Sequence, residues 1–189
     1  MCKFIDKNTV KITRMASELD KFVLDFVGVV EKHCKYVIVS GYVSILFGRS
    51  RVTEDIDMII SSMDRKAFEK LHADLIKKGF DVVNVDDLDE LYGLLTTKHS
   101  IRYAYKGGVI PNMELKFAHD RLQKEILEAN LKVIIGGKVL HVSPLELQIA
   151  FKEKILGSEK DKEDARHLEI MFKNNLDKEK LKVYRLMLK

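Results

Sequence analysis

The feature that most constrains this chain is a pair of aspartates at the head of an apolar strand. Asp55 and Asp57 stand two positions apart, and the run continues Met-Ile-Ile. Side chains alternate along a strand, so both carboxylates lie on one face while Ile56 and Met58 point into the core. Carboxylates held this close repel each other unless a cation joins them. The pattern predicts a buried sheet with a cation site; the alternative is a pair of solvated aspartates.

A strand, a glycine and a short helix precede this pair. Tyr36–Val39 is typical of a buried strand, and Ser40 and Gly41 follow it directly. Glycine lets the backbone approach a phosphate closely, and a helix starting at Tyr42 would point its free N–H groups at the same place. We therefore expect Ser40 and Gly41 to hold phosphate, with a plain turn as the alternative.

The loop between the two strands carries Arg49, Arg51 and Thr53 toward the carboxylates. Mg²⁺, or Mn²⁺ in its place, takes oxygen ligands, usually one or two protein carboxylates completed by water and phosphate. Cations beside a carboxylate pair therefore predict a metal–triphosphate site in which these three residues contact phosphate. The alternative is that Arg49 and Arg51 are solvated loop charges.

The stretch from residue 39 to residue 60 resembles the signature of the nucleotidyltransferase superfamily related to DNA polymerase β, over about 22 residues. Within it, Gly48–Asp57 is most similar to the AbiEii and MenT group of toxin-like nucleotidyltransferases. The resemblance implies an α/β fold with a mixed α+β sheet, and transfer of a nucleoside monophosphate from an NTP with release of pyrophosphate. It implies as acceptor an RNA or tRNA 3′ end or a protein hydroxyl, and as partner a cognate antitoxin protein.

Tyr42 departs from that signature, because the family usually has Ser or Thr after the glycine to touch a phosphate. Ser40 and Ser44 are the nearest hydroxyls. The departure keeps a second hypothesis open, a catalytically weak nucleotide-binding regulatory protein on the same fold. A third hypothesis is a toxin–antitoxin component that acts through protein contacts alone. A phosphatase using the same aspartates has no further signature in its favour.

The resemblance also implies a third acidic residue on a later strand, which would activate the attacking hydroxyl or complete a second metal site. The segment Asn112–Phe117 alternates, and Glu114 falls on its polar face together with Lys116. We therefore expect Asp55, Asp57 and Glu114 to be the catalytic, metal-binding carboxylates. The alternative is an ordinary exposed glutamate beside a lysine.

The pattern changes after residue 142. Ser143 and Pro144 predict a helix start, with the serine as cap and the proline at the first helical position. Only helical patterns follow, with a break near Gly157. We therefore predict a nucleotidyltransferase catalytic lobe at 1–142 and a small helical C-terminal lobe at 143–189.

Charged residues lie on the apolar faces of these C-terminal helices. Lys152 shares a face with Leu and Ile residues of the first helix, and Asp161 and Asp164 share one in the next. Acids there need partners, because an unpaired buried charge is costly, and Lys152 or Lys154 is placed to pair with them. One interpretation is a salt bridge between lobes. The family resemblance favours the other, in which Lys152 contacts the triphosphate and Asp164 holds it in place.

Composition sets the remaining bounds. The chain has 189 residues, 46% of them apolar, and a net charge of +4, which permits an RNA acceptor without requiring one. No apolar run approaches the ~18 residues of a membrane span, and the first residues lack the pattern of a signal peptide. Cys2 and Cys34 form no metal-like cluster, and the six histidines have no metal-ligand spacing. We expect a cytoplasmic protein with no membrane partner.

Overall fold

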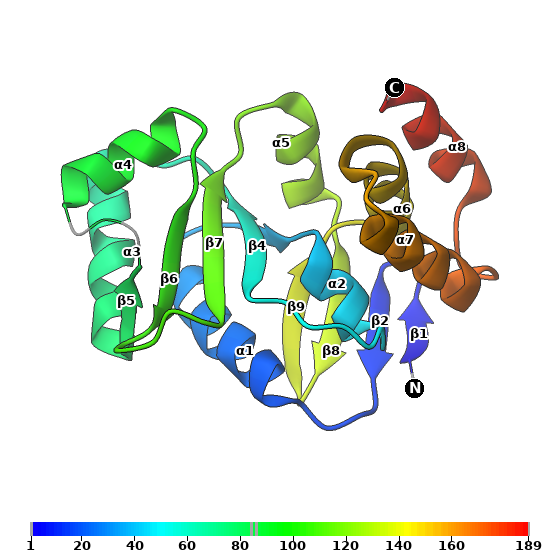
Figure 1. Ribbon diagram of the computed structural model, residues 1–189, viewed down its shortest axis with the longest axis horizontal. Helices are drawn as coiled ribbons and strands as arrows, with labels where there is room; N and C mark the ends of the chain where they lie inside the picture. The colour runs from blue at the N-terminus through cyan, green and yellow to red at the C-terminus, as the bar shows by residue number, and fades with distance from the viewer. Residues whose placement is uncertain (1, 84, 86, 189) are drawn as a thin grey trace.

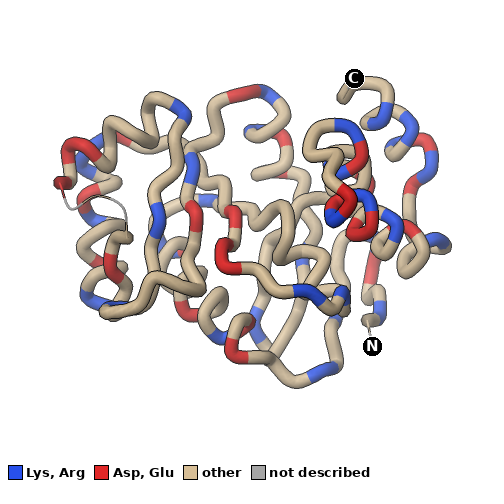
Figure 2. Tube along the Cα trace, viewed as in Figure 1, with Lys and Arg blue, Asp and Glu red and all other residues tan. Residues whose placement is uncertain are grey.

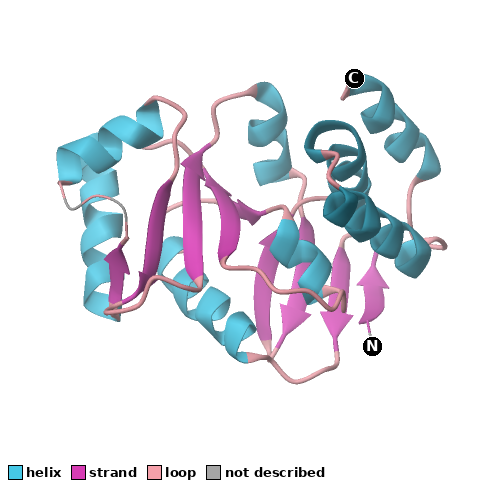
Figure 3. Ribbon diagram, in the orientation of Figure 1, coloured by secondary structure: helices cyan, strands magenta, loops and turns pink. Residues whose placement is uncertain are grey.

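The computed structural model describes residues 2–83, 85 and 87–188, which form a mixed sheet surrounded by helices (Figures 1 and 3). The strands are β1 (Cys2–Asp6), β2 (Thr9–Ile12), β3 (Tyr36–Ile38), β4 (Asp55–Ile60), β5 (Phe80–Val82), β6 (Ile101–Tyr105), β7 (Asn112–Phe117), β8 (Leu131–Ile135) and β9 (Lys138–Val142). The helices are α1 (Glu18–Val30), α2 (Gly41–Leu46), α3 (Arg65–Lys78), α4 (Leu88–Thr96), α5 (Arg121–Glu128), α6 (Leu145–Phe151), the π-helical turn η1 (Lys152–Leu156), α7 (Glu159–Phe172) and α8 (Lys178–Met187).

The strands lie in the order β1-β2-β8-β9-β3-β4-β7-β6-β5. β4 pairs with β7 in parallel, as do β2 with β8 and β3 with β9, while the remaining neighbours are antiparallel. The predicted α/β class with a mixed sheet is confirmed. The parallel β4–β7 contact is the one that matters for the site, because it joins segments more than fifty residues apart in the sequence.

Local signals in the sequence explain where most helices begin and end. Ser17 caps α1 and exchanges hydrogen bonds with Asp20 in a capping box. Asp64 caps α3, which ends at Gly79 with φ 96°, a left-handed conformation that glycine adopts without a Cβ penalty. Gly157 ends η1 in the same left-handed region, at the predicted break.

Two local expectations need correction. The N-terminal hairpin β1–β2 adds two strands that were not predicted from the sequence. Ser143 does not cap α6: the helix starts at Leu145 with Pro144 in the cap position at φ −52° and ψ 139°. The Ser143 hydroxyl instead donates to the Oε1 atom of Gln148 at 2.7 Å, because strand β9 delivers it into the protein interior.

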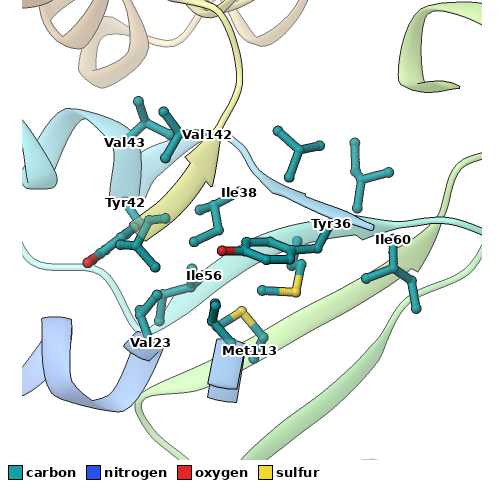
Figure 4. Close-up of a cluster of buried hydrophobic side chains, with 14 of the residues drawn as sticks. Val23, Tyr36, Ile38, Tyr42, Val43, Ile56, Ile60, Met113 and Val142 are labelled. Atoms are coloured by element: carbon teal, nitrogen blue, oxygen red, sulfur yellow. The ribbon is translucent and has the colours of Figure 1, made fainter. Parts of the chain in front are cut away.

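One part of the core lies between the sheet and α1, and buried residues of the other helices continue it. Figure 4 shows Val23 of α1 grouped with Ile38, Ile56 and Met113 from three neighbouring strands, and all four are fully buried. Ile56 therefore points inward from β4, as its alternation predicted, which leaves the aspartates beside it on the opposite face.

The C-terminal helices α6, η1, α7 and α8 gather on the side of the molecule where β1 and β2 lie, and α7 contacts α2 (Figure 1). Acidic and basic residues lie close together there (Figure 2). The last strand ends at Val142, and the first of the C-terminal helices starts at Leu145. The division into lobes 1–142 and 143–189 stays a prediction. Among the described residues, no helix has the length and apolar run that crossing a bilayer requires.

Candidate active site

The three predicted carboxylates come together through strand pairing. In the parallel register of β4 and β7, Asp57 lies opposite Glu114 and Asp55 lies opposite Asn112. Opposed residues of neighbouring strands share a face, so Asp55, Asp57 and Glu114 all stand on the side away from the α1 core. Glu114 is 8% exposed, which excludes the ordinary surface glutamate of the alternative interpretation.

Two cations join these acids. The Lys116 Nζ lies 2.7 Å from Oε1 of Glu114 and 3.4 Å from Oδ1 of Asp57. Arg102, opposite Glu114 on β6, reaches the other glutamate oxygen with its Nη2 at 3.0 Å. We call Asp55, Asp57, Glu114, Lys116 and Arg102 the carboxylate row.

The pKa values of the two inner acids move in opposite directions. Burial raises the pKa of Asp57; the Lys116 charge opposes the rise, and the charges of Glu114 and Asp55 add to it. Burial also raises the pKa of Glu114, but hydrogen bonds and charge from Lys116 and a hydrogen bond from Arg102 outweigh burial and leave that pKa lowered. Of these two acids, Asp57 is the one whose negative charge the protein compensates less, so an added cation beside it would be favourable.

Ser40 stands beside Asp57 in a strained backbone conformation, with φ 63° and ψ −134°. Non-glycine residues avoid this region, at a cost of about 1–3 kcal/mol. The buried side chain of Gln148 holds it there: its Nε2 donates to the Ser40 carbonyl at 2.6 Å, and its Oε1 accepts from the Ser40 N–H at 3.3 Å. The first C-terminal helix, α6, therefore fixes the turn that was predicted to hold phosphate.

Gly41 lets an arginine lie over the start of α2. A Cβ added at Gly41 would stand 2.9 Å from Nη2 of Arg51, closer than real Cβ contacts. A side chain at this position would have to displace the Arg51 guanidinium. Nearer the strand, the Thr53 hydroxyl donates to the Asp55 carbonyl at 3.0 Å and so braces the loop against the carboxylate pair.

A second charged group forms around a fully buried aspartate of α7. The Oδ2 atom of Asp164 accepts from Lys152 Nζ at 2.8 Å and from Arg51 Nη1, while Arg49 Nε lies 3.4 Å from Oδ1. Lys152 also reaches Asp161 at 3.3 Å. We call Asp164, Lys152, Arg49 and Arg51 the Asp164 cluster. It gathers three cations, which pair with Asp164, Asp161 and Glu163.

A cavity of about 240 Å³ separates the two groups. Its lining comes from the Ser40 turn, the loop before β4, the aspartates and the start of α7: Ser40, Gly41, Arg51, Thr53, Asp55, Asp57, Leu156, Ser158, Lys160 and Asp161. Lys152, Asp164, Arg49 and Glu114 stand behind this lining. A larger hollow of about 640 Å³ opens elsewhere, between the β1–β2 turn and α8, and its described lining includes none of the predicted site residues.

Comparison with solved structures identifies the architecture. An antigenic nucleotidyltransferase-like protein from Paracoccidioides brasiliensis aligns with a TM-score of 0.54 and 19% identity, over 92% of this chain and 88% of that one. The antibiotic-resistance factor ANT(2″)-Ia aligns in its solution structure with a TM-score of 0.55 and 16% identity, over 92% of both chains. Its crystal structure with adenylyl-2″-tobramycin gives 0.53 and 15%, over 89% of this chain and 95% of that one. This chain has a nucleotidyltransferase-like fold.

Because all three identities are below 20%, these likenesses show the fold alone. No protein-family model and no curated protein matches the chain. The mixed sheet followed by C-terminal helices, expected from the resemblance of residues 39–60, is confirmed.

In this nucleotidyltransferase-like fold, Tyr42 does not occupy the phosphate position that its place in the sequence suggested. Its ring is fully buried, and its hydroxyl donates to Oδ1 of Asp20 on α1 at 2.7 Å. Asp20 in turn pairs with Arg14. Tyr42 therefore anchors α2 to the core and takes no part in lining the cavity.

The arrangement of the three carboxylates fits a site in which two of them bind one divalent cation better than a site in which all three bind metal. Within the described part of the chain, no three His, Cys, Asp or Glu side chains are grouped as a metal site. Glu114 turns both of its oxygens toward cations, while the Asp55–Asp57 pair faces the cavity with the two-carboxylate donor set that Mg²⁺ accepts. The buried Nε atoms of Arg49 and Arg51 have no hydrogen-bond partner among the described residues, and Arg49 Nε lies 3.4 Å from Oδ1 of Asp164.

Sequence reasoning named neither Lys116 nor Gln148 as a site residue. The signal for Lys116 was its position two residues after Glu114, on the same strand face. The signal for Gln148 was its place three residues after Leu145, on the apolar side of the predicted helix. Of the two competing lysines, Lys152 is fully buried in the Asp164 cluster, and Lys154 is exposed.

Proposed function

We propose that this protein is a Mg²⁺-dependent nucleotidyltransferase that moves a nucleoside monophosphate from an NTP to an acceptor hydroxyl. The observation that carries the proposal is the pairing of opposite charges across one small cavity. Asp55 and Asp57 face it from β4, and Arg51 faces it from the other side, backed by Lys152. Carboxylates that attract a metal and cations that attract phosphate are the two halves of a metal–NTP site.

Each half has a defined part in this proposal. Asp55 and Asp57 hold the divalent ion, which would neutralise phosphate charge as a Lewis acid. Ser40 and Gly41 support the phosphates through the turn that Gln148 fixes. Arg51 and Thr53, which line the cavity, supply the positive and polar contacts, and Arg49 and Lys152 add positive charge from behind them. Asp164 is a positioning residue because it orients Arg51 and Lys152 without lining the cavity.

Glu114 is the residue that we assign to the acceptor side. It lies next to Asp57 across the strand pair, and the Lys116 and Arg102 cations keep it ionised, since they lower its pKa. An ionised carboxylate beside the metal-binding pair can accept a hydrogen bond from an incoming hydroxyl and so orient it for attack. Arg51 and Lys152 offset the negative charge that develops on the phosphates in the transition state.

For the acceptor we propose an RNA or tRNA 3′ end or a protein hydroxyl, as the AbiEii and MenT resemblance of Gly48–Asp57 suggests. A toxin role with a cognate antitoxin belongs to the same proposal. The ANT(2″)-Ia structure with adenylyl-2″-tobramycin adds a small-molecule hydroxyl to the set that the assay must cover. Tyr42, whose identity favoured the regulatory alternative, lies outside the cavity lining, so no observed contact now favours that alternative.

A labelling screen tests the proposal. Each α-³²P NTP is incubated with Mg²⁺ or Mn²⁺ and, in separate reactions, total RNA, the protein itself and tobramycin. Wild type runs beside Asp55→Ala/Asp57→Ala and the control Asp81→Ala/Asp89→Ala, which removes two exposed acids elsewhere. Label transferred by wild type and the control but not by Asp55→Ala/Asp57→Ala supports the proposal. Metal-dependent NTP binding without transfer to any acceptor favours the regulatory protein. For an RNA acceptor, binding should weaken steeply with salt.

A further inference from the structure

We propose that Lys116 is a built-in cation of the candidate active site, standing where a second divalent ion would otherwise bind. The site then holds one divalent ion per chain. This inference rests on the proposed function, because it assumes that Asp55 and Asp57 bind the first ion.

The contacts of Lys116 are those expected of a bridging cation. Its ammonium lies 2.7 Å from Oε1 of Glu114 and 3.4 Å from Oδ1 of Asp57, two acids placed directly opposite each other on parallel strands. Two-metal sites place their ions about 3.5–4 Å apart and use shared carboxylates to hold both. An ammonium and a divalent ion cannot use the same two oxygens at once, so Lys116 excludes a second metal from this position.

Arg102 closes the other side of Glu114. Its Nε and Nη2 lie 3.2 Å and 3.0 Å from Oε2, so both oxygens of the glutamate are engaged by cations. Asp57 pairs with Lys116 through Oδ1. Within the described residues, no ion pair engages Asp55, which lines the cavity together with Asp57. The oxygens left for a metal are therefore those of the Asp55–Asp57 pair.

The charge balance points the same way. The carboxylate row consists of three carboxylates and two cations, which leaves one net negative charge within the row, and its two aspartates line the cavity. One divalent ion reverses that charge and suits a polyphosphate. Without Lys116, Asp57 and Glu114 would be like charges directly opposite each other, a destabilising arrangement on neighbouring strands. Lys116 is thus a positioning residue: it contacts both acids and holds Glu114 beside Asp57 with no metal at that point.

Counting bound Mn²⁺ tests this without relying on activity. The full-length chain is titrated with Mn²⁺ and followed by electron paramagnetic resonance, alone and with a non-hydrolysable α,β-methylene NTP analogue. We expect one Mn²⁺ per wild-type chain. Lys116→Met removes the charge and should gain a second Mn²⁺ at least ten times more tightly than any further ion on wild type. Lys116→Arg keeps the charge and should stay at one, as should the control Lys132→Met on the exposed face of β8.

The outcomes separate this inference from the function beneath it. Two tight Mn²⁺ ions on wild type overturn the role of Lys116 while leaving the nucleotidyltransferase proposal intact, and that result needs no variant to fold. A single ion on a folded Lys116→Met chain overturns it as well. If wild type binds no Mn²⁺ even with the analogue, the proposed metal site at Asp55 and Asp57 fails, and the inference fails with it. A single ion on wild type that disappears in Asp55→Ala/Asp57→Ala places the ion where the inference requires.

Discussion

The carboxylate row and the Asp164 cluster face one cavity, yet different forces hold them. Residues of the row are fixed by the hydrogen-bonded register of β4, β7 and β6, so their side chains stay close whatever their charges. The Asp164 cluster joins a loop, the π-helical turn η1 and α7, and its own ionic contacts hold these elements together. Backbone pairing can therefore hold like-charged side chains close together, whereas a cluster held only by side-chain contacts needs opposite charges that attract each other.

This difference assigns the two regions opposite effects on stability. The raised pKa of Asp57 means that its ionised form is less favourable in the folded protein than in the unfolded chain, so its charge costs stability at neutral pH. Asp164 is surrounded by cations and fully buried, so its removal would leave Lys152 buried without its closest partner. Substitutions that remove one charge from each region test the contrast directly.

The largest expected effect comes from Asp57→Asn. Losing a metal-binding carboxylate should lower the transfer rate at least about 10³-fold, which corresponds to about 4 kcal/mol of lost transition-state stabilisation. The same change removes a repelled buried charge, so the Tm measured without metal should rise by about 2–4 °C, the shift that ~1 kcal/mol produces at this chain size. Asp81→Asn, at an exposed position of β5, is the control and should change neither the transfer rate nor the Tm. A lower Tm for Asp57→Asn would contradict the contrast.

Asp164→Asn should have the opposite effect on stability. Breaking a buried ion pair by removing one partner costs about 3–5 kcal/mol, because the remaining charge stays buried. Urea unfolding at pH 7 measures this loss. Glu163→Gln is the matched control, because Glu163 lies on the same helix as Asp164, is exposed and pairs with Arg49. Loss of this exposed ion pair should cost less than about 1 kcal/mol. Equal costs for the two variants would show that burial does not distinguish them.

The same contrast explains how much could be predicted. Alternation within β4 and β7 is a local property, so the shared face of Asp55 and Asp57 and the polar face of Glu114 followed from the sequence. The register that sets Asp57 opposite Glu114 joins distant segments, and no local pattern encodes it. The resemblance to nucleotidyltransferases supplied the expectation that these strands meet.

The Asp164 cluster was harder to predict because it depends on tertiary contacts. Arg51 and Asp164 are 113 residues apart. The sequence pattern assigns Arg51 to phosphate and pairs Asp164 with Lys152 or Lys154, but nothing in it joins Arg51 to Asp164. The spacing of apolar residues does place Lys152 on the buried face of its helix, but it does not reveal the π-helical turn that starts at Lys152. The strained conformation of Ser40 was equally invisible, since the residue type argues against it.

Asp20 is a buried acid outside the cavity, and it pairs with Arg14. It can therefore be compared with Asp57 and Asp164. Burial raises its pKa, but hydrogen bonds from Arg14, Tyr42 and Ser17 outweigh burial and lower the pKa from 3.8 to about 2. Each pKa unit is worth 1.36 kcal/mol, so Asp20→Asn should cost about 2 kcal/mol at pH 7.

The pH dependence of this cost has a definite sign. Because the folded pKa of Asp20 is lowered, its contribution is complete above pH 4 and is lost as the pH falls toward 2. Unfolding curves of wild type and Asp20→Asn should therefore converge over that range. Tyr42→Phe, which removes only the hydroxyl that Asp20 accepts from, should cost about 1 kcal/mol and leave NTP transfer unchanged. A gap between wild type and Asp20→Asn that stays constant down to pH 2 would contradict the assignment.

The smallest effect is expected at Gln148, which connects the two regions. It lies on α6, one turn before Lys152, and its amide holds the strained Ser40 turn beside Asp57. Gln148→Met fills the same space without hydrogen bonds, so Ser40 should relax. Since the turn supports phosphate in the proposed function, the KM for NTP should rise about tenfold, the equivalent of about 1.4 kcal/mol, with kcat changed less than twofold.

Glycine at position 40 separates positioning from a general loss of structure. Glycine adopts φ 63° without strain, so Ser40→Gly introduced into the Gln148→Met chain should recover at least half of the lost NTP affinity, measured as KM. Ser143→Ala removes only the hydroxyl that donates to Gln148 and should raise KM less than about threefold. If Ser40→Gly gives no recovery, or if Gln148→Met lowers kcat while KM stays constant, then α6 acts on the site by some route other than the Ser40 backbone.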